Sequence, residues 1–102
     1  MMTEDDAAYF AKTMTELQRA VILLCSRKES WGYSRLAEKT GATYGDVRSV
    51  GHFLQSANLA RVSPVRLSQE FNGSAIFLND RGDQVRLAAE RLSKRKKHAP
   101  NQ

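Results

Sequence analysis

Cysteine is nearly absent from this chain. Cys25 is the only one among 102 residues, so an intramolecular disulfide is excluded. Cys25 lies in the apolar run 21–25, where we expect it to pack as a small buried hydrophobe. A redox-sensing thiol is the alternative, but no Lys, Arg or His is clearly placed to lower its pKa. This sparing use of cysteine is typical of a reducing compartment.

Long apolar runs and export signals are also missing. No apolar stretch approaches the roughly 20 residues that a helix needs to cross a bilayer. The N-terminal segment is acidic and lacks the charged-then-apolar pattern of an export signal. We therefore expect a cytoplasmic protein that makes no use of a membrane.

The patterns of catalytic and metal sites are missing as well. There is no glycine-rich phosphate loop, no pair of acids in a plausible cleft and no nucleophile–base pair. The two histidines, His52 and His98, are too few and too far apart to indicate zinc. We expect neither an enzyme nor a bound cofactor or metal.

What the chain does have is an excess of positive charge. The formal net charge is +5, in a composition of 41% apolar and 26% charged residues that is ordinary for one folded domain. Residues 4–6 are acidic, whereas most charges between 81 and 97 are positive. This balance predicts a polyanionic partner, although a merely solvated basic surface would have the same charge.

Residues 33–54 are the most informative stretch. Leu36 and Ala37 fall on the buried face of a first short helix, and Gly41 follows where the chain must turn sharply. Ala37 is small, as two closely crossing helices require, and Gly41 adopts positive φ at no steric cost. On a second helix the apolar residues recur at helical spacing, at Val47, Val50 and Leu54. The pattern predicts a helix-turn-helix that places one helix in a DNA groove, with a generic helical pair as the alternative.

Two further segments precede this pair. Residues 1–12 are expected to form a partly helical arm. Thr13 and Glu16 have the spacing of a capping box, and the helix they begin is predicted to end near Ser26.

The two helices of the predicted helix-turn-helix have residues that mark where each helix begins. Residues 31–33 are predicted to be a short strand or an extended lead, and Ser34 is predicted to cap a helix over 35–40. Thr43, with an acid three residues later, is predicted to cap the second helix, which covers residues 43–57.

The periodicity then changes to that of strands. Asn58 is predicted to be left-handed, and residues 61–68 and 75–78 are β-like. Asn72-Gly73 is a hairpin turn signal. Pro64 requires an edge strand or a bulge, and the broken alternation there favours the bulge.

The last helix is predicted to begin at Asn79 and Asp80, with Gly82 in its first turn. Residues 94–102 are expected to be a basic, disordered tail. The chain is thereby divided into an N-terminal helical arm (1–12), one domain (13–93) and the tail. The domain is mainly α with a small β-hairpin, in the element order of a winged helix-turn-helix.

The central part of the chain resembles that of MarR- and ArsR-type bacterial transcriptional regulators. The likeness is carried by Leu36–Gly41, Val47 and residues 53–54 and 58–62. Leu78–Gly82 is similar to the strand-to-helix junction of the MarR type. The likeness covers about residues 14–92. It implies a winged helix that binds double-stranded DNA.

In such a fold the solvent side of the 43–57 helix faces base edges. Arg48 is the predicted base reader, because its guanidinium can donate two hydrogen bonds to guanine O6 and N7. The alternatives are that Arg48 pairs with Asp46 and that Tyr44 only covers the helix N-terminus. The residues predicted to contact DNA from this face are Thr43, Tyr44, Gly45, Arg48, Ser49 and His52.

Phosphate contacts are predicted from the elements that precede and follow this helix in the chain. Arg35 and Lys39 would supply them from the preceding helix. On the hairpin the predicted contacts are Arg61, Arg66, Asn72 and Gly73. Such contacts set the register on the duplex rather than the sequence preference.

The resemblance also implies that terminal helices pair two subunits. The residues predicted at that interface are Phe10, Ala11, Leu87, Ala88 and Leu92, unless this face only closes the core of one subunit. Taken together, the sequence predicts a dimeric regulator that binds specific DNA sequences. The alternative is a winged-helix module that recruits a protein partner, because fold alone does not settle function.

Overall fold

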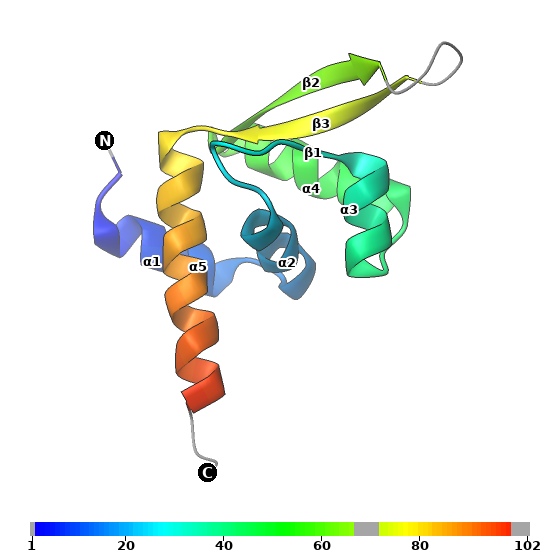
Figure 1. The fold of residues 1–102 in the computed structure, drawn as a ribbon. Coiled ribbons are helices and arrows are strands. Elements are labelled where there is room, and N and C mark those ends of the chain that lie inside the picture. The colour runs from blue at the N-terminus through cyan, green and yellow to red at the C-terminus, as the bar shows by residue number, and fades with distance from the viewer. Residues whose placement is uncertain (1, 67–71, 99–102) are drawn as a thin grey trace.

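The computed structural model describes residues 2–66 and 72–98 (Figure 1). Within these residues, the helices lie on one side of a small antiparallel sheet whose strand order is β1-β3-β2 (Figure 1). The elements are α1 (Glu4–Thr13), α2 (Glu16–Leu24), β1 (Trp31–Gly32), α3 (Tyr33–Thr40), α4 (Tyr44–Ser56), β2 (Ala60–Arg66), β3 (Asn72–Leu78) and α5 (Asp80–His98). No helix among the described residues combines the length and apolar character needed to cross a membrane.

The capping box that begins α2 is shifted from the predicted one. The Thr15 hydroxyl accepts from the Gln18 N–H, and the Gln18 side chain accepts from the Thr15 N–H. Thr13 instead ends α1, where its hydroxyl donates to the carbonyls of Tyr9 and Phe10. The predicted Thr13–Glu16 box is therefore wrong. Thr13 and Thr15 both fit the pattern of a capping box, but Thr13 is the last residue of α1.

The start of α3 also differs from the prediction. Gly32 occupies the N-cap position in extended conformation and no side chain caps the helix, so Ser34 is not the cap. The short strand β1 pairs Trp31 with Ile76 and Gly32 with Ala75 of β3. Helix α3 begins at Tyr33, directly after this strand.

The β2–β3 hairpin, which we call the wing, pairs without interruption from Ala60↔Leu78 to Arg66↔Asn72. The favoured bulge at Pro64 is therefore wrong, and the other alternative holds, because β2 is an edge strand. Asn72 and Gly73 belong to β3 and are not the turn. The residues that connect the two strands lie outside the described part of the chain.

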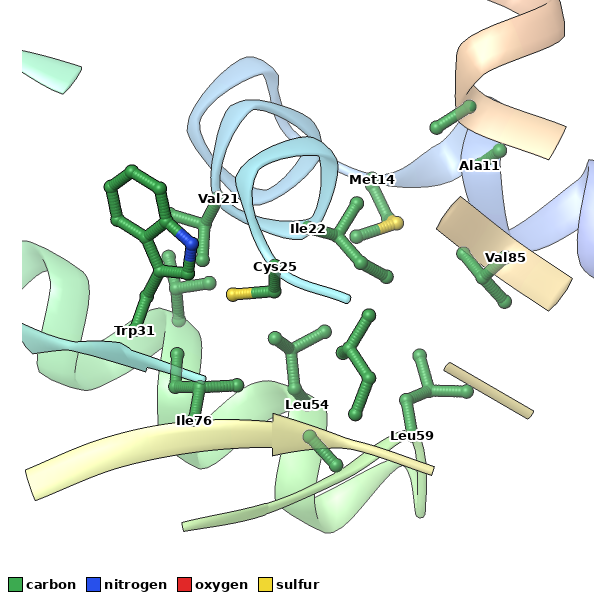
Figure 2. Packing of buried hydrophobic residues seen from close by; sticks show 14 of the residues in the cluster. Ala11, Met14, Val21, Ile22, Cys25, Trp31, Leu54, Leu59, Ile76 and Val85 are labelled. Atoms are coloured by element: carbon green, nitrogen blue, oxygen red, sulfur yellow. The ribbon is translucent and has the colours of Figure 1, made fainter. Parts of the chain in front are cut away.

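The core lies between α2 on one side and α4 with the sheet on the other (Figure 2). Figure 2 shows Val21 and Ile22 of α2, and Cys25 at its C-cap, directed toward Leu54 of α4 and Ile76 of β3, all of them buried. The prediction of a buried Cys25 is confirmed. Burial, with a smaller effect of the Glu29 carboxylate, raises the pKa of this thiol to about 12. A redox-sensing thiol needs to be accessible and partly ionised near neutral pH, and the buried Cys25, with its raised pKa, lacks the surroundings for that role.

The two terminal helices pack against each other within the subunit. Ala11 of α1 and Ala88 of α5 are buried at 0% and 3% exposure, so their side chains do not contribute to an open surface. Phe10 and Leu92 are partly buried, and Leu87 is 41% exposed. Helix α5 runs to His98 and thus continues into the segment expected to be a tail.

Candidate nucleic-acid interface

The predicted turn between α3 and α4 is confirmed in detail. Gly41 has φ 76°, and its N–H donates to the Ala37 carbonyl at 2.9 Å. Thr43 is the N-cap of α4, where its hydroxyl accepts from the Asp46 N–H at 3.1 Å. A left-handed glycine followed by a capped helix start fixes the angle at which α4 leaves α3.

Helix α4 has one buried side and one solvent side. Val47, Val50 and Leu54 are buried, as their spacing predicts. The exposed residues include every position that the sequence assigned to base contact: Thr43, Tyr44, Gly45, Arg48, Ser49 and His52. The Ser49 hydroxyl donates to the Gly45 carbonyl of the preceding turn. These residues therefore share one open surface on one rigid element.

Arg48 stands at the middle of this surface. Among the residues that the structure describes, no carboxylate forms an ion pair with Arg48, so the alternative pairing with Asp46 is not present. The Asp46 carboxylate lies in the first turn of α4, where it interacts favourably with the helix dipole. The Arg48 side chain is exposed to solvent.

Tyr44 is 40% exposed at the start of α4 and touches Tyr33 of α3. The two ring centroids are 5.5 Å apart, with the planes at 77° in an edge-to-face contact. Burial raises the pKa of the Tyr33 hydroxyl, Tyr44 raises it further, and the nearby Arg48 acts in the opposite direction. Sequence reasoning did not single out Tyr33; the available signal was Gly51, a glycine in a helix interior without an evident local reason.

The two cations predicted on α3 differ in their surroundings. Arg35 lies over the Trp31 ring, 3.9 Å from its centroid, and 3.8 Å from a carboxylate oxygen of Glu29. Lys39 is exposed, and no ion pair of Lys39 occurs within residues 2–66 and 72–98. Arg35 is thus held in place, whereas Lys39 extends freely from the last turn of α3.

On the wing, Arg61 lies over the Phe77 ring at 4.6 Å from its centroid and donates to the Ser63 hydroxyl. The wing is tied to α4 because the Val62 N–H donates to Oε1 of Gln55 at 3.0 Å. Of the other predicted wing contacts, Gly73 pairs with Val65, and Arg66 pairs with Asn72 at the far end of the two strands. Figure 1 shows this end reaching well beyond the helices.

The arrangement of these elements has counterparts among solved structures. A mutant of ZitR from Lactococcus lactis matches with a TM-score of 0.63 and 19% identity over 82% of this chain. YusO from Bacillus subtilis matches with a TM-score of 0.63 and 16% identity over 87%. The chain has a winged helix-turn-helix fold. The resemblance to MarR-type regulators is therefore confirmed for the fold.

A third similar structure is BpsR from Bordetella bronchiseptica, with a TM-score of 0.57 and 18% identity over 91% of this chain. The DNA binding of BpsR is regulated by 6-hydroxynicotinic acid. The chain spans 54% of the ZitR chain, 64% of the YusO chain and 76% of the BpsR chain. No protein-family model and no curated protein sequence matches it.

Proposed function

We propose that this protein is a transcriptional regulator that binds specific sequences of double-stranded DNA through α4. The observation that supports this most directly is the solvent side of α4. Every residue assigned to base contact is exposed there, and Arg48, with no ion pair among the described residues, lies at its middle. A helix that is anchored on one side and carries free donors on the other suits the major groove.

In this proposal Arg48 donates two hydrogen bonds to guanine O6 and N7, which is worth roughly 1–3 kcal/mol of discrimination. Thr43 and Tyr44 contact phosphate or a thymine methyl group at the start of the helix. Gly45 lacks a side chain and lets the backbone approach the groove wall, with Ser49 and His52 following along the same face.

Cations on the flanking elements would hold the duplex in register. Lys39 and Arg35 would contact phosphates before α4, and Arg61 and Arg66 would contact phosphates along the wing. Arg35 and Arg61 each already lie over an aromatic ring, which reduces the entropy that they lose when a phosphate binds. Phosphate contacts of this kind make binding steeply dependent on salt.

A second copy of the chain is part of the proposal. Leu87 offers an exposed apolar side chain on α5, with the partly buried Phe10 and Leu92 as further candidates for the interface. Ala11 and Ala88 would support that face from inside the subunit. Two α4 helices would then read half-sites about one DNA turn apart. Sedimentation at high micromolar concentration tests this part, and a monomer there would contradict it.

The central experiment is selection of bound sequences from a random duplex pool, followed by affinity measurements on the selected duplex and on a scrambled one. Arg48→Ala should lower affinity for the selected duplex about 5- to 100-fold, with a much smaller effect on the scrambled one. Arg91→Ala is the matched control, because it removes one exposed arginine from α5, outside the helix-turn-helix.

The same experiment can contradict the proposal. If no duplex binds at physiological salt, or if Arg48→Ala and Arg91→Ala have equal effects, α4 does not read DNA. A winged helix that recruits a protein partner would then be the better interpretation.

A further inference from the structure

Tyr33 is the one tyrosine of this chain that is buried, at 3% exposure, and it lies directly beneath the proposed DNA-contact surface. Its hydroxyl has no hydrogen-bond partner among the described residues. A buried hydroxyl without a partner reduces stability, so the hydroxyl does not explain why a large aromatic side chain stands here. The ring itself must make the useful contacts.

One of these contacts is to Gly51 in the middle of α4. A Cβ atom at Gly51 would stand 2.4 Å from the Tyr33 hydroxyl oxygen and 2.9 Å from two ring carbons. Since real Cβ atoms essentially never approach so closely, only glycine admits the ring at this place. Glycine inside a helix costs stability, so Gly51 is explained by the space that it leaves for Tyr33.

The other contact is to Tyr44. The edge-to-face geometry, with centroids 5.5 Å apart and planes at 77°, is a favourable one for two aromatic rings. Tyr33 is enclosed by α3 and α4, while Tyr44 is 40% exposed at the start of α4. The enclosed ring therefore restricts the position of the exposed one.

We propose that Tyr33 and Gly51 are positioning residues for Tyr44, and that they hold the Tyr44 ring where it contacts a thymine methyl group, so that this arrangement sets the preference for thymine at that DNA position. Gly51 admits the Tyr33 ring, Tyr33 holds the Tyr44 ring, and Tyr44 meets the duplex. Tyr33 acts through Tyr44, because its own side chain is closed off from any ligand. This inference rests on the proposed function of α4.

A double-mutant cycle tests it, with the ratio of affinities for the selected and scrambled duplexes as the readout. Tyr33→Leu removes the aromatic contact and should lower this ratio about 3- to 10-fold. Tyr33→Phe keeps the ring and removes only the unpartnered hydroxyl, so the ratio should be unchanged. In a Tyr44→Ala background, Tyr33→Leu should cause no further loss, because its effect passes through Tyr44.

Gly51→Ala provides an independent variant. Its methyl group displaces the Tyr33 ring, so the ratio should fall as it does for Tyr33→Leu. Ser56→Ala, at the exposed end of α4, is the control that leaves this contact intact. All affinities are measured well below each variant's unfolding temperature, so that a stability loss is not counted as a loss of preference.

Three outcomes would overturn the inference. The first is that losses from Tyr33→Leu and Tyr44→Ala add. The second is that Tyr33→Leu weakens both duplexes equally, as a purely structural role would. The third is that Gly51→Ala leaves the ratio unchanged. These are distinct from failure of the proposed function, in which the unaltered protein itself shows no preferred duplex.

Discussion

Gly82 lies at the junction between the wing and α5, and replacing it with alanine should strongly destabilise the fold. A Cβ atom at this position would stand 2.0 Å from the Leu59 carbonyl oxygen and 3.1 Å from a methyl carbon of Leu78. Leu59 is fully buried, and the nearest of these atoms belongs to the backbone. No rotamer change can relieve the clash, so the start of α5 must move away from the start of β2 by more than an ångström.

That movement has a calculable cost. Overpacking a core typically costs about 1–3 kcal/mol. The Asn79 N–H donates to the same Leu59 carbonyl at 3.1 Å, and the Gly82 N–H donates to Oδ1 of Asn79 at 2.9 Å. Weakening these two bonds adds about 1 kcal/mol for each. Gly82→Ala should thus lower the free energy of unfolding by about 3–5 kcal/mol, or the urea midpoint by about 2 M.

The assay is urea unfolding followed by fluorescence of Trp31, the only tryptophan and a buried one. Gly45→Ala is the matched control, since Gly45 also lies in the first turn of a helix. The nearest atom to a Cβ there is the Thr43 hydroxyl oxygen at 3.9 Å, so this variant should be about 0.4–1 kcal/mol more stable. Equal midpoints for Gly82→Ala and the unaltered protein would refute the reasoning.

Two more predictions concern single residues. Burial raises the pKa of the Cys25 thiol to about 12, so the stability that comes from the protonated thiol should be lost as pH rises from about 9 toward 12. Over this range the unaltered protein should lose more unfolding free energy than Cys25→Ala does. Alkylation of the native protein at the rate of a free thiol would contradict this prediction. Asn79→Ala removes both the cap of α5 and a donor to the Asn58 carbonyl. It should cost about 1–2 kcal/mol by urea unfolding, and no loss would show that water replaces the cap.

Much of the helix-turn-helix was predictable because its signals are local. Gly41 and Asn58 adopt left-handed φ values of 76° and 61°, as their types and positions indicate. The Thr43 cap and the inward apolar face of α4 follow from spacing alone. Each of these features depends on residues within a few positions of one another, which is the range over which sequence patterns are informative.

The errors arose where two local interpretations competed. Thr13 and Thr15 both fit a capping pattern, and only the length of α1 decides between them. Asn72-Gly73 is a strong turn signal, yet pairing with β2 continues through Gly73 to Asn72. In both cases the outcome depends on a neighbouring element rather than on the pattern itself.

Gly45, Gly51 and Gly82 show why the remaining contacts could not be predicted. All three are helical glycines with ordinary φ, so a local rule assigns each the same cost relative to alanine. Their surroundings differ: an ordinary contact with the Thr43 hydroxyl at Gly45, the Tyr33 ring at Gly51 and the Leu59 carbonyl at Gly82. The sign of a Gly→Ala change is therefore set by residues 18 and 23 positions away in the sequence. The two crowded glycines allow the close contacts of α4 with α3 and of α5 with the start of the wing. The absence of a side chain at Gly51 and Gly82 therefore contributes to the position of the proposed DNA-contact surface.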